Sequence, residues 1–135
     1  MELKVLLPGR WRITSPLGKG SMSLTEEFLN GLAASFESSA NGLIVMMEQH
    51  SEHGPDHFNT AQCHYVDQRD QIYEYIKGRL RLFWFEDEDR VVICMHGIIK
   101  KDQKTPRREI ERAKRVKADY LRAKAQGSLI FIEEE

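Results

Sequence analysis

The sequence predicts a single α+β domain with a helical hairpin packed on one face of an antiparallel sheet, in the order β-α-α-β-β-β-α. Two patterns support this class. Apolar residues recur at helical spacing between residues 24 and 50 and again after residue 106. Between these regions, residues 72–99 contain three apolar segments of strand length, separated by short turns. Helices and strands that are segregated along the chain in this way are typical of α+β proteins.

Length and composition are those of one water-exposed globular domain. The chain has 135 residues, of which 41% are hydrophobic and 30% charged, so residues 1–135 are expected to share one core. No apolar run approaches the roughly 20 residues that span a bilayer, and no secretory signal is evident at the start. Cys63 and Cys94 are too few for a disulfide framework. A cytoplasmic protein without membrane contact is therefore expected.

The N-terminal part is expected to contain a strand and two helices. Residues 10–14 alternate polar and apolar side chains, which predicts a short strand. Ser23, with Glu26 three residues later, forms a capping box that opens a helix. Asn41-Gly42 is expected to interrupt the helical pattern, and a second helix to run on to Gly54-Pro55. The inner side of the first helix consists of Leu24, Phe28, Leu29, Leu32 and Phe36.

The C-terminal part is expected to contain the sheet and a final helix. Strands are predicted over residues 72–76, 80–85 and 90–99, with shorter ones over 61–66 and 129–132. Thr105 is the expected N-cap of a helix that Pro106 opens, and Gly127 its C-terminal stop. The inner side of this helix is predicted to consist of Ile110, Ala113, Val116, Lys117, Tyr120 and Leu121.

Charge is distributed unevenly along the chain. Residues 1–76 carry 10 acidic and 5 basic side chains, whereas residues 77–125 carry 15 basic and 8 acidic ones. Residues 126–135 end in an acidic tail of three glutamates, Glu133 to Glu135. Five cations follow the strand that ends at residue 99: Lys100, Lys101, Lys104, Arg107 and Arg108. Cations at a helix start oppose the helix dipole, and a bound phosphate would reverse that cost. The segment therefore predicts either a nucleic-acid site or a helix with a solvated basic face.

Two further groups of side chains have less specific patterns. The histidines at positions 50, 53 and 57, with Cys63-His64 nearby, could suggest zinc, but Gly54-Pro55 ends the helix between them. Paired Cys-x-x-Cys spacings are absent from the sequence, so a polar loop without metal is expected. The aromatic residues of the strands could stack on bases or fill the core, and are Tyr73, Tyr75, Phe83, Trp84 and Phe85.

Several motifs in a fixed order carry a family resemblance. The second helix ends in His53-Gly-Pro55, and the strand segments Ile72-Tyr-Glu-Tyr-Ile76 and Arg81-Leu-Phe-Trp-Phe85 follow. The longest motif is His96-Gly-Ile-Ile-Lys-Lys-Asp-Gln-Lys-Thr-Pro106, continued by Glu109-Ile110 and by Asp119-Tyr-Leu121. Over residues 43–121 the sequence resembles the HigB-like, phage-derived branch of the RelE/ParE toxin superfamily. Residues 1–42 are similar only in their strand-then-helix layout.

This resemblance implies a toxin of a type II toxin–antitoxin pair. Most toxins of the superfamily cleave mRNA on the ribosome without a metal or other cofactor, while the ParE branch poisons gyrase. In the nucleases a ribose 2′-hydroxyl attacks the adjacent phosphate, and cations stabilise the charge that develops there. The implied partners are a helix-turn-helix antitoxin, mRNA and the ribosome.

The resemblance also assigns roles to individual residues. Arg81 falls on the family's strand arginine, which implies phosphate stabilisation; the alternative is a surface arginine. Lys101 falls on a cation that follows the last central strand. His96 is either a general acid or base or a hydrogen-bonded core histidine. The remaining cations would contact RNA or ribosomal backbone, and are Arg79, Lys100, Lys104, Arg107 and Arg108.

One departure from the family affects the expected activity. Ile76 stands where the family has an arginine, and Lys77 follows it. Because a one-residue step in a strand reverses the side chain's face, either a bulge brings Lys77 inward or the site lacks one cation. The departure favours an alternative in which the protein keeps the fold but is a gyrase-directed toxin or an inactive homologue that binds its antitoxin. A phage-derived nucleic-acid-binding protein without toxicity is a further alternative.

Overall fold

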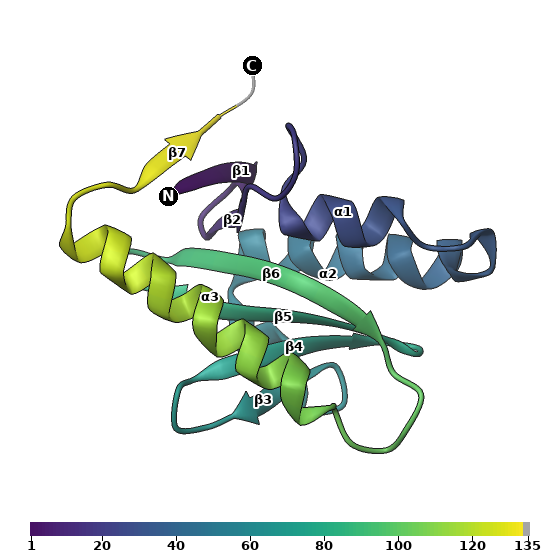
Figure 1. Ribbon diagram of the computed structural model, residues 1–135. Coiled ribbons are helices and arrows are strands. Elements are labelled where there is room, and N and C mark those ends of the chain that lie inside the picture. Colours follow the sequence, from purple (N-terminus) through teal and green to yellow (C-terminus); the bar gives the residue numbers. More distant parts are fainter. Residues whose placement is uncertain (134–135) are drawn as a thin grey trace.

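A mixed β-sheet organises the protein, as a computed structural model that describes residues 1–133 shows (Figure 1). These residues form seven strands and three α-helices, which confirms the α+β class. The spatial order of the strands is β3-β4-β5-β6-β2-β1-β7. Their bounds are β1 Glu2–Pro8, β2 Arg12–Pro16, β3 Cys63–Asp67, β4 Ile72–Lys77, β5 Leu80–Asp87, β6 Val91–Ile99 and β7 Ile130–Ile132. Glu134 and Glu135 of the predicted acidic tail lie outside the described residues.

The expectation of a purely antiparallel sheet is wrong. Strands β3 to β6 form the predicted antiparallel meander, but β2 pairs parallel with β6, and β1 pairs parallel with β7. The parallel pairs arise because long connections that contain helices separate their strands in the sequence, and such connections permit parallel pairing. Strands β3 and β7 lie at the two places where short strands were predicted. Strand β1 was not predicted. All three add to the predicted order of elements.

Only some of the helix ends lie where the sequence predicted them. They are α1 Leu24–Asn30, α2 Glu37–His53 and α3 Arg107–Ala125, with short 3-10 turns at Ala34–Phe36 and Pro55–His57. The capping box is confirmed, since Ser23 and Glu26 each accept a hydrogen bond from the other's backbone amide. The predicted break at Asn41-Gly42 is wrong: α2 runs through it. The aliphatic chain of Lys77 lies over Gly42, so the missing side chain lets β4 approach the helix.

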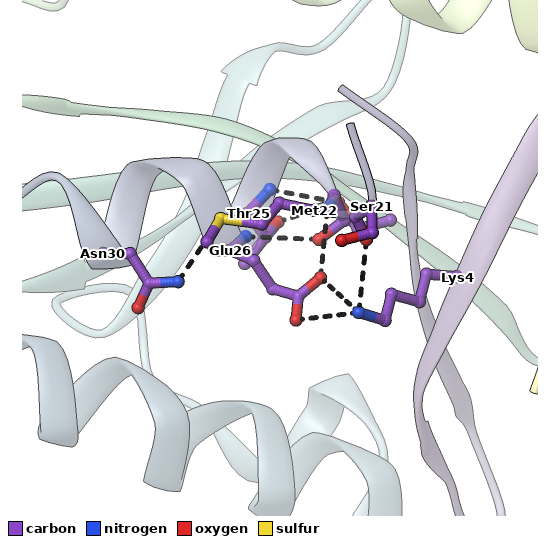
Figure 2. Close-up of polar contacts among 8 residues, drawn as sticks. Lys4, Ser21, Met22, Thr25, Glu26 and Asn30 are labelled. Carbon is purple, nitrogen blue, oxygen red and sulfur yellow. Dashed lines mark hydrogen bonds and ion pairs between the residues drawn. The ribbon is translucent and has the colours of Figure 1, made fainter. Parts of the chain in front are cut away.

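Strand β1 is tied to α1 by polar contacts (Figure 2). The ammonium of Lys4 lies 3.1 Å from the Glu26 carboxylate and donates to the carbonyl of Ser21 at 3.4 Å. The carboxylate of Glu26 therefore both caps α1 and holds β1. Burial alone would raise the pKa of this carboxyl, but the hydrogen bond from the Ser23 backbone amide and the contact with Lys4 lower it. This arrangement fixes α1 against the part of the sheet that the sequence predicted least well.

Helices cover both faces of the sheet: the predicted helical hairpin, α1 and α2, packs on one face, and α3 covers the other. Figure 1 shows α1 and α2 behind the sheet and α3 in front of it. Strand β5 explains this arrangement, because Leu82 and Trp84 pack towards α2, whereas Phe83 and Phe85 pack towards α3. A strand that is apolar on both sides needs a layer on each. Leu121, predicted on the inner side of α3, is 46% exposed.

The aromatic residues of the central strands are core residues. Trp84 is 1% exposed and stacks on Tyr73, with ring centroids 4.3 Å apart and an interplanar angle of 12°. Its ring also stacks on Tyr75, at 5.3 Å. Tyr73 continues the stack to Tyr65 on β3. This aromatic stack fills the space between the sheet and α2, so packing rather than base stacking accounts for most of these rings.

A bulge in β6 sets which side chains face α3. Leu82 pairs with Gly97 and Trp84 with Cys94, so three steps on β6 match two on β5. The extra residue lets His96 join Met95 on the α3 side, where the imidazole contacts the ring of Phe83. Gly97 then faces α1, against the ring of Phe28.

The substitution Gly97→Ala is expected to lower the free energy of unfolding by about 1–3 kcal/mol, the usual cost of overpacking. A Cβ at this position would meet the Phe28 ring and would lie 2.8 Å from the backbone carbonyl of Arg81, which cannot move freely. Gly42→Ala is the contrasting variant, because the flexible chain of Lys77 can give way and alanine favours the helix by up to about 1 kcal/mol. Urea unfolding of the two variants tests this; equal midpoints would contradict it.

Candidate functional site

The basic segment, residues 100–108, is anchored at two points on the sheet. The backbone amide of Lys100 donates to the carbonyl of Arg79 at 2.7 Å. The hydroxyl of Thr105 donates to Glu74 Oε1 at 3.3 Å. The expected capping of α3 by Thr105 is therefore wrong: Pro106 occupies the N-cap position, and the hydroxyl is used on β4 instead. The anchors hold the segment at the β4–β5 turn and at the middle of β4.

The cations of the basic segment are available to a ligand. Lys101, Lys104, Arg107 and Arg108 are exposed, and Lys100 is half-buried. Within residues 1–133 none of the five forms an ion pair with a carboxylate, whereas Lys114 and Lys124 further along the chain each contact acidic side chains. Arg79 lies beside the segment, with its guanidinium 6.0 Å from the Phe36 ring. The structure thus places Arg79 beside the basic segment, which holds the other predicted RNA-binding residues.

Arg81 lies beneath this surface and is held firmly. Its side chain is only 13% exposed, and the guanidinium donates to the carbonyls of Gly78 and Leu80 at 2.8 and 2.9 Å. Its Nε lies 3.8 Å from Glu74 Oε2. Arg81 is therefore not a freely solvated surface arginine, which was one of the two interpretations of the sequence.

Lys77 does not join Arg81. Strands β4 and β5 stay in register from Tyr73 to Lys77, so Ile76 is the residue opposite Arg81, on the α3 side. Lys77 points to the other face, where it lies over Gly42. The β4–β5 pairing therefore contains no bulge that would turn Lys77 towards Arg81. The α3 side of β4 has Ile76 at the position where the sequence comparison with the HigB-like family expected an arginine.

A histidine and a glutamate that the sequence did not single out for catalysis complete the site. His64 and Glu74 are paired residues of β3 and β4, and His64 Nε2 lies 2.7 Å from Glu74 Oε2. We name the group of His64, Glu74, Arg81 and Thr105 the Glu74 cluster, because all three partners contact this carboxylate. His64 and Glu74 are each five residues from Arg69 in the sequence. A hairpin centred on Arg69 would therefore have predicted that they pair.

His96 lies elsewhere, buried against α3. It is 4% exposed, and neither ring nitrogen has a hydrogen-bond partner among the described residues. Burial, with a smaller contribution from Arg112, lowers the pKa of His96 to about 4. Glu109 Oε1 lies 3.5 Å from Nε2, but burial outweighs this contact. His96 is a neutral core histidine at pH 7 that borders a pocket of about 390 Å³ between α1 and α3, and it is not hydrogen-bonded as one interpretation expected.

The other histidines are dispersed. His50 is buried, and its Nδ1 lies 2.6 Å from the Tyr75 hydroxyl, while His53 and His57 stack on each other 5.2 Å apart. Within residues 1–133 no three His, Cys, Asp or Glu side chains are placed to hold a metal ion. In the same part of the chain, no helix has the length and apolar character that crossing a membrane requires.

The fold and this site define a small α+β protein with a cationic surface suited to an anionic polymer. Residues 27–118 match the phage-derived protein Gp49-like family (DUF891), and the chain belongs to this family. The family is associated with toxin–antitoxin systems. A comparison with curated proteins gives no match.

Proposed function

We propose that the protein is the toxin of a type II toxin–antitoxin pair, of the HigB-like branch of the RelE/ParE superfamily, and that it cleaves mRNA on the ribosome without a metal. The observation that carries this proposal is the basic segment, whose five cations lack carboxylate partners within residues 1–133 and are anchored beside Arg81. Unpaired cations on a fixed loop bind a sugar–phosphate backbone and release its counterions.

In this proposal two cations stabilise the transition state. Attack of a 2′-hydroxyl on the adjacent phosphorus places extra negative charge on the phosphoryl oxygens. Arg81 is pre-organised by two backbone carbonyls, so its orientation costs little when RNA binds. Lys101, on the exposed part of the basic segment, supplies the second cation. The other cations hold the RNA in register, and a helix-turn-helix antitoxin would cover the same surface.

Expression of the protein without an antitoxin, followed by mapping of mRNA 5′ ends, tests this function. Wild-type protein is expected to arrest growth and to produce cuts in phase with codons. The double variant Lys101→Gln, Lys104→Gln is expected to bind programmed ribosomes about 10-fold or more weakly at low salt, with a shallower salt dependence. The control is Arg69→Gln, Arg122→Gln, which removes the same charge away from the basic segment; of these two residues, Arg122 pairs with Asp119. Intact messages in arrested cells would contradict the proposal.

A second candidate function is a toxin directed at gyrase or an inactive, antitoxin-binding homologue. Two observations favour it: Ile76 leaves the α3 side of β4 without a cation, and Glu74 balances the charge of Arg81. DNA breaks with intact messages would identify the gyrase-directed protein. Tight antitoxin binding without growth arrest would identify the inactive homologue.

A further inference from the structure

The Glu74 cluster contains His64, whose ring is partly exposed to solvent and is held in place by a buried carboxylate. The His64 side chain is 43% exposed on the edge strand β3, whereas Glu74, its neighbour on β4, is 1% exposed. A buried carboxylate is costly unless it is paired and hydrogen-bonded. Glu74 is satisfied by the imidazole at 2.7 Å and by the Thr105 hydroxyl at 3.3 Å. The carboxylate therefore fixes the orientation of the His64 ring.

Each ring nitrogen of His64 lies beside one oxygen of the protein. Nε2 faces the Glu74 carboxylate, and Nδ1 lies 3.2 Å from the backbone carbonyl of Thr60. Both partners are acceptors, and only the doubly protonated imidazolium donates from both nitrogens. Nε2 is turned towards the buried Glu74. Nδ1 is on the exposed side, where another oxygen could replace the carbonyl of Thr60 at 3.2 Å.

The same carboxylate connects this ring to the proposed RNA-binding surface. Glu74 Oε2 lies 2.7 Å from His64 Nε2 and 3.8 Å from Arg81 Nε. The other oxygen of Glu74 accepts from Thr105, which anchors the basic segment. An imidazole ring with one nitrogen on its exposed side is thus held next to the arginine proposed to stabilise the phosphate.

We infer that His64 is the general acid of the cleavage reaction, with Glu74 as its positioning residue; this inference rests on the proposed function. The 2′-oxygen forms a bond to phosphorus and loses its proton to solvent water. The bond between phosphorus and the 5′-oxygen breaks, and His64 Nδ1 transfers its proton to that oxygen. The products are a 2′,3′-cyclic phosphate and a free 5′-hydroxyl, and a proton from water restores the imidazolium.

His96, the histidine for which the sequence left an acid–base role open, is less suited to it. Its ring is buried against α3 and neutral at pH 7, with no proton exposed to a ligand. His64, in contrast, combines exposure with a fixed orientation, as a proton donor requires.

A sulfur-substituted substrate separates a proton donor from a structural residue. The substrate is a short mRNA on programmed ribosomes in which the mapped bond has a bridging 5′-sulfur, because a thiolate leaves without protonation. His64→Gln is expected to cleave normal mRNA about 10²–10⁴-fold more slowly than wild type, the usual contribution of an acid–base group. On the sulfur substrate it is expected to come within about threefold of wild type, because that step needs no general acid. Glu74→Gln should show a smaller loss with the same rescue.

His57→Gln is the matched control, since His57 is exposed near α2 and stacks only on neighbouring rings. It should cleave both substrates like wild type. Slow cleavage of both substrates by His64→Gln would assign His64 a structural role and overturn the inference, as would unchanged cleavage of normal mRNA. In either case the proposed nuclease would stand. Absence of cleavage by wild-type protein would overturn the proposed function and this inference together.

Discussion

The free energy of unfolding is expected to fall by about 5 kcal/mol between pH 7.5 and pH 4.5, because two histidines are buried as neutral rings. Burial lowers the pKa of His50 to about 4, and burial with the nearby Arg112 lowers that of His96 to about 4. In the unfolded chain both rings regain a pKa near the ordinary value of 6.5. Each histidine contributes about 2–3 kcal/mol to the difference.

The sign follows from proton uptake. Between pH 6.5 and about 4 the unfolded chain binds protons at these rings and the folded protein does not, so acid favours unfolding. The stabilisation is complete above pH 6.5 and is lost as the pH falls towards 4. The acidic groups that face these rings, Glu86 at 4.0 Å from His50 and Glu109 at 3.5 Å from His96, reduce the effect without reversing it.

Urea unfolding at a series of pH values measures this loss. His50→Gln and His96→Gln remove the titrating rings, and each is expected to remove about half of the pH dependence across this range. His57→Gln, at an exposed position, should leave it unchanged. A double variant His50→Gln, His96→Gln with the full wild-type pH dependence would show that other groups cause the loss.

Arg81→Ala is expected to reduce mRNA cleavage by about 10²–10³-fold, the cost of removing one pre-organised group that stabilises developing charge. It should also lower the free energy of unfolding by about 3 kcal/mol, at the low end for a broken buried pair, because His64 still contacts Glu74. The two effects have different origins. The first comes from the bound phosphate and the second from the buried carboxylate.

A second variant separates these origins. Arg81→Ala with Glu74→Gln removes both charges of the buried pair, so part of the lost stability should return. Cleavage should remain low, because no guanidinium faces the phosphate. Recovery of cleavage together with stability would mean that Arg81 only supports the fold. Melting temperatures and single-turnover cleavage rates of the two variants make the comparison.

Local patterns predicted the elements that depend on neighbouring residues. The meander from β4 to β6 and the capping box of α1 have their signals within a few positions of the structure they form. Strand β1 was not predicted, although it forms a local hairpin with β2. Its partners are β2 and the distant β7, and Leu3 is buried only because that sheet edge assembles.

The part of the candidate site that was predicted is the part that a cluster of charged residues in the sequence defines. The cluster of cations at residues 100–108 is evident from the sequence, and the structure keeps it exposed. Cross-strand contacts decide the rest. Thr105 was predicted to cap the following helix, but its hydroxyl donates to Glu74 on β4. His64 gained its partner through strand register, and His96 was buried by a bulge.

The aromatic stack makes the interior of this protein optically distinctive. The chain has two tryptophans: Trp84 lies between tyrosine rings, and Trp11 is half-exposed beneath the guanidinium of Arg90. Closely stacked rings in a fixed geometry couple their electronic transitions and give a strong near-ultraviolet circular dichroism signal. A Trp11→Phe protein would therefore contain a single built-in reporter, whose signal disappears when the layer between the sheet and α2 opens.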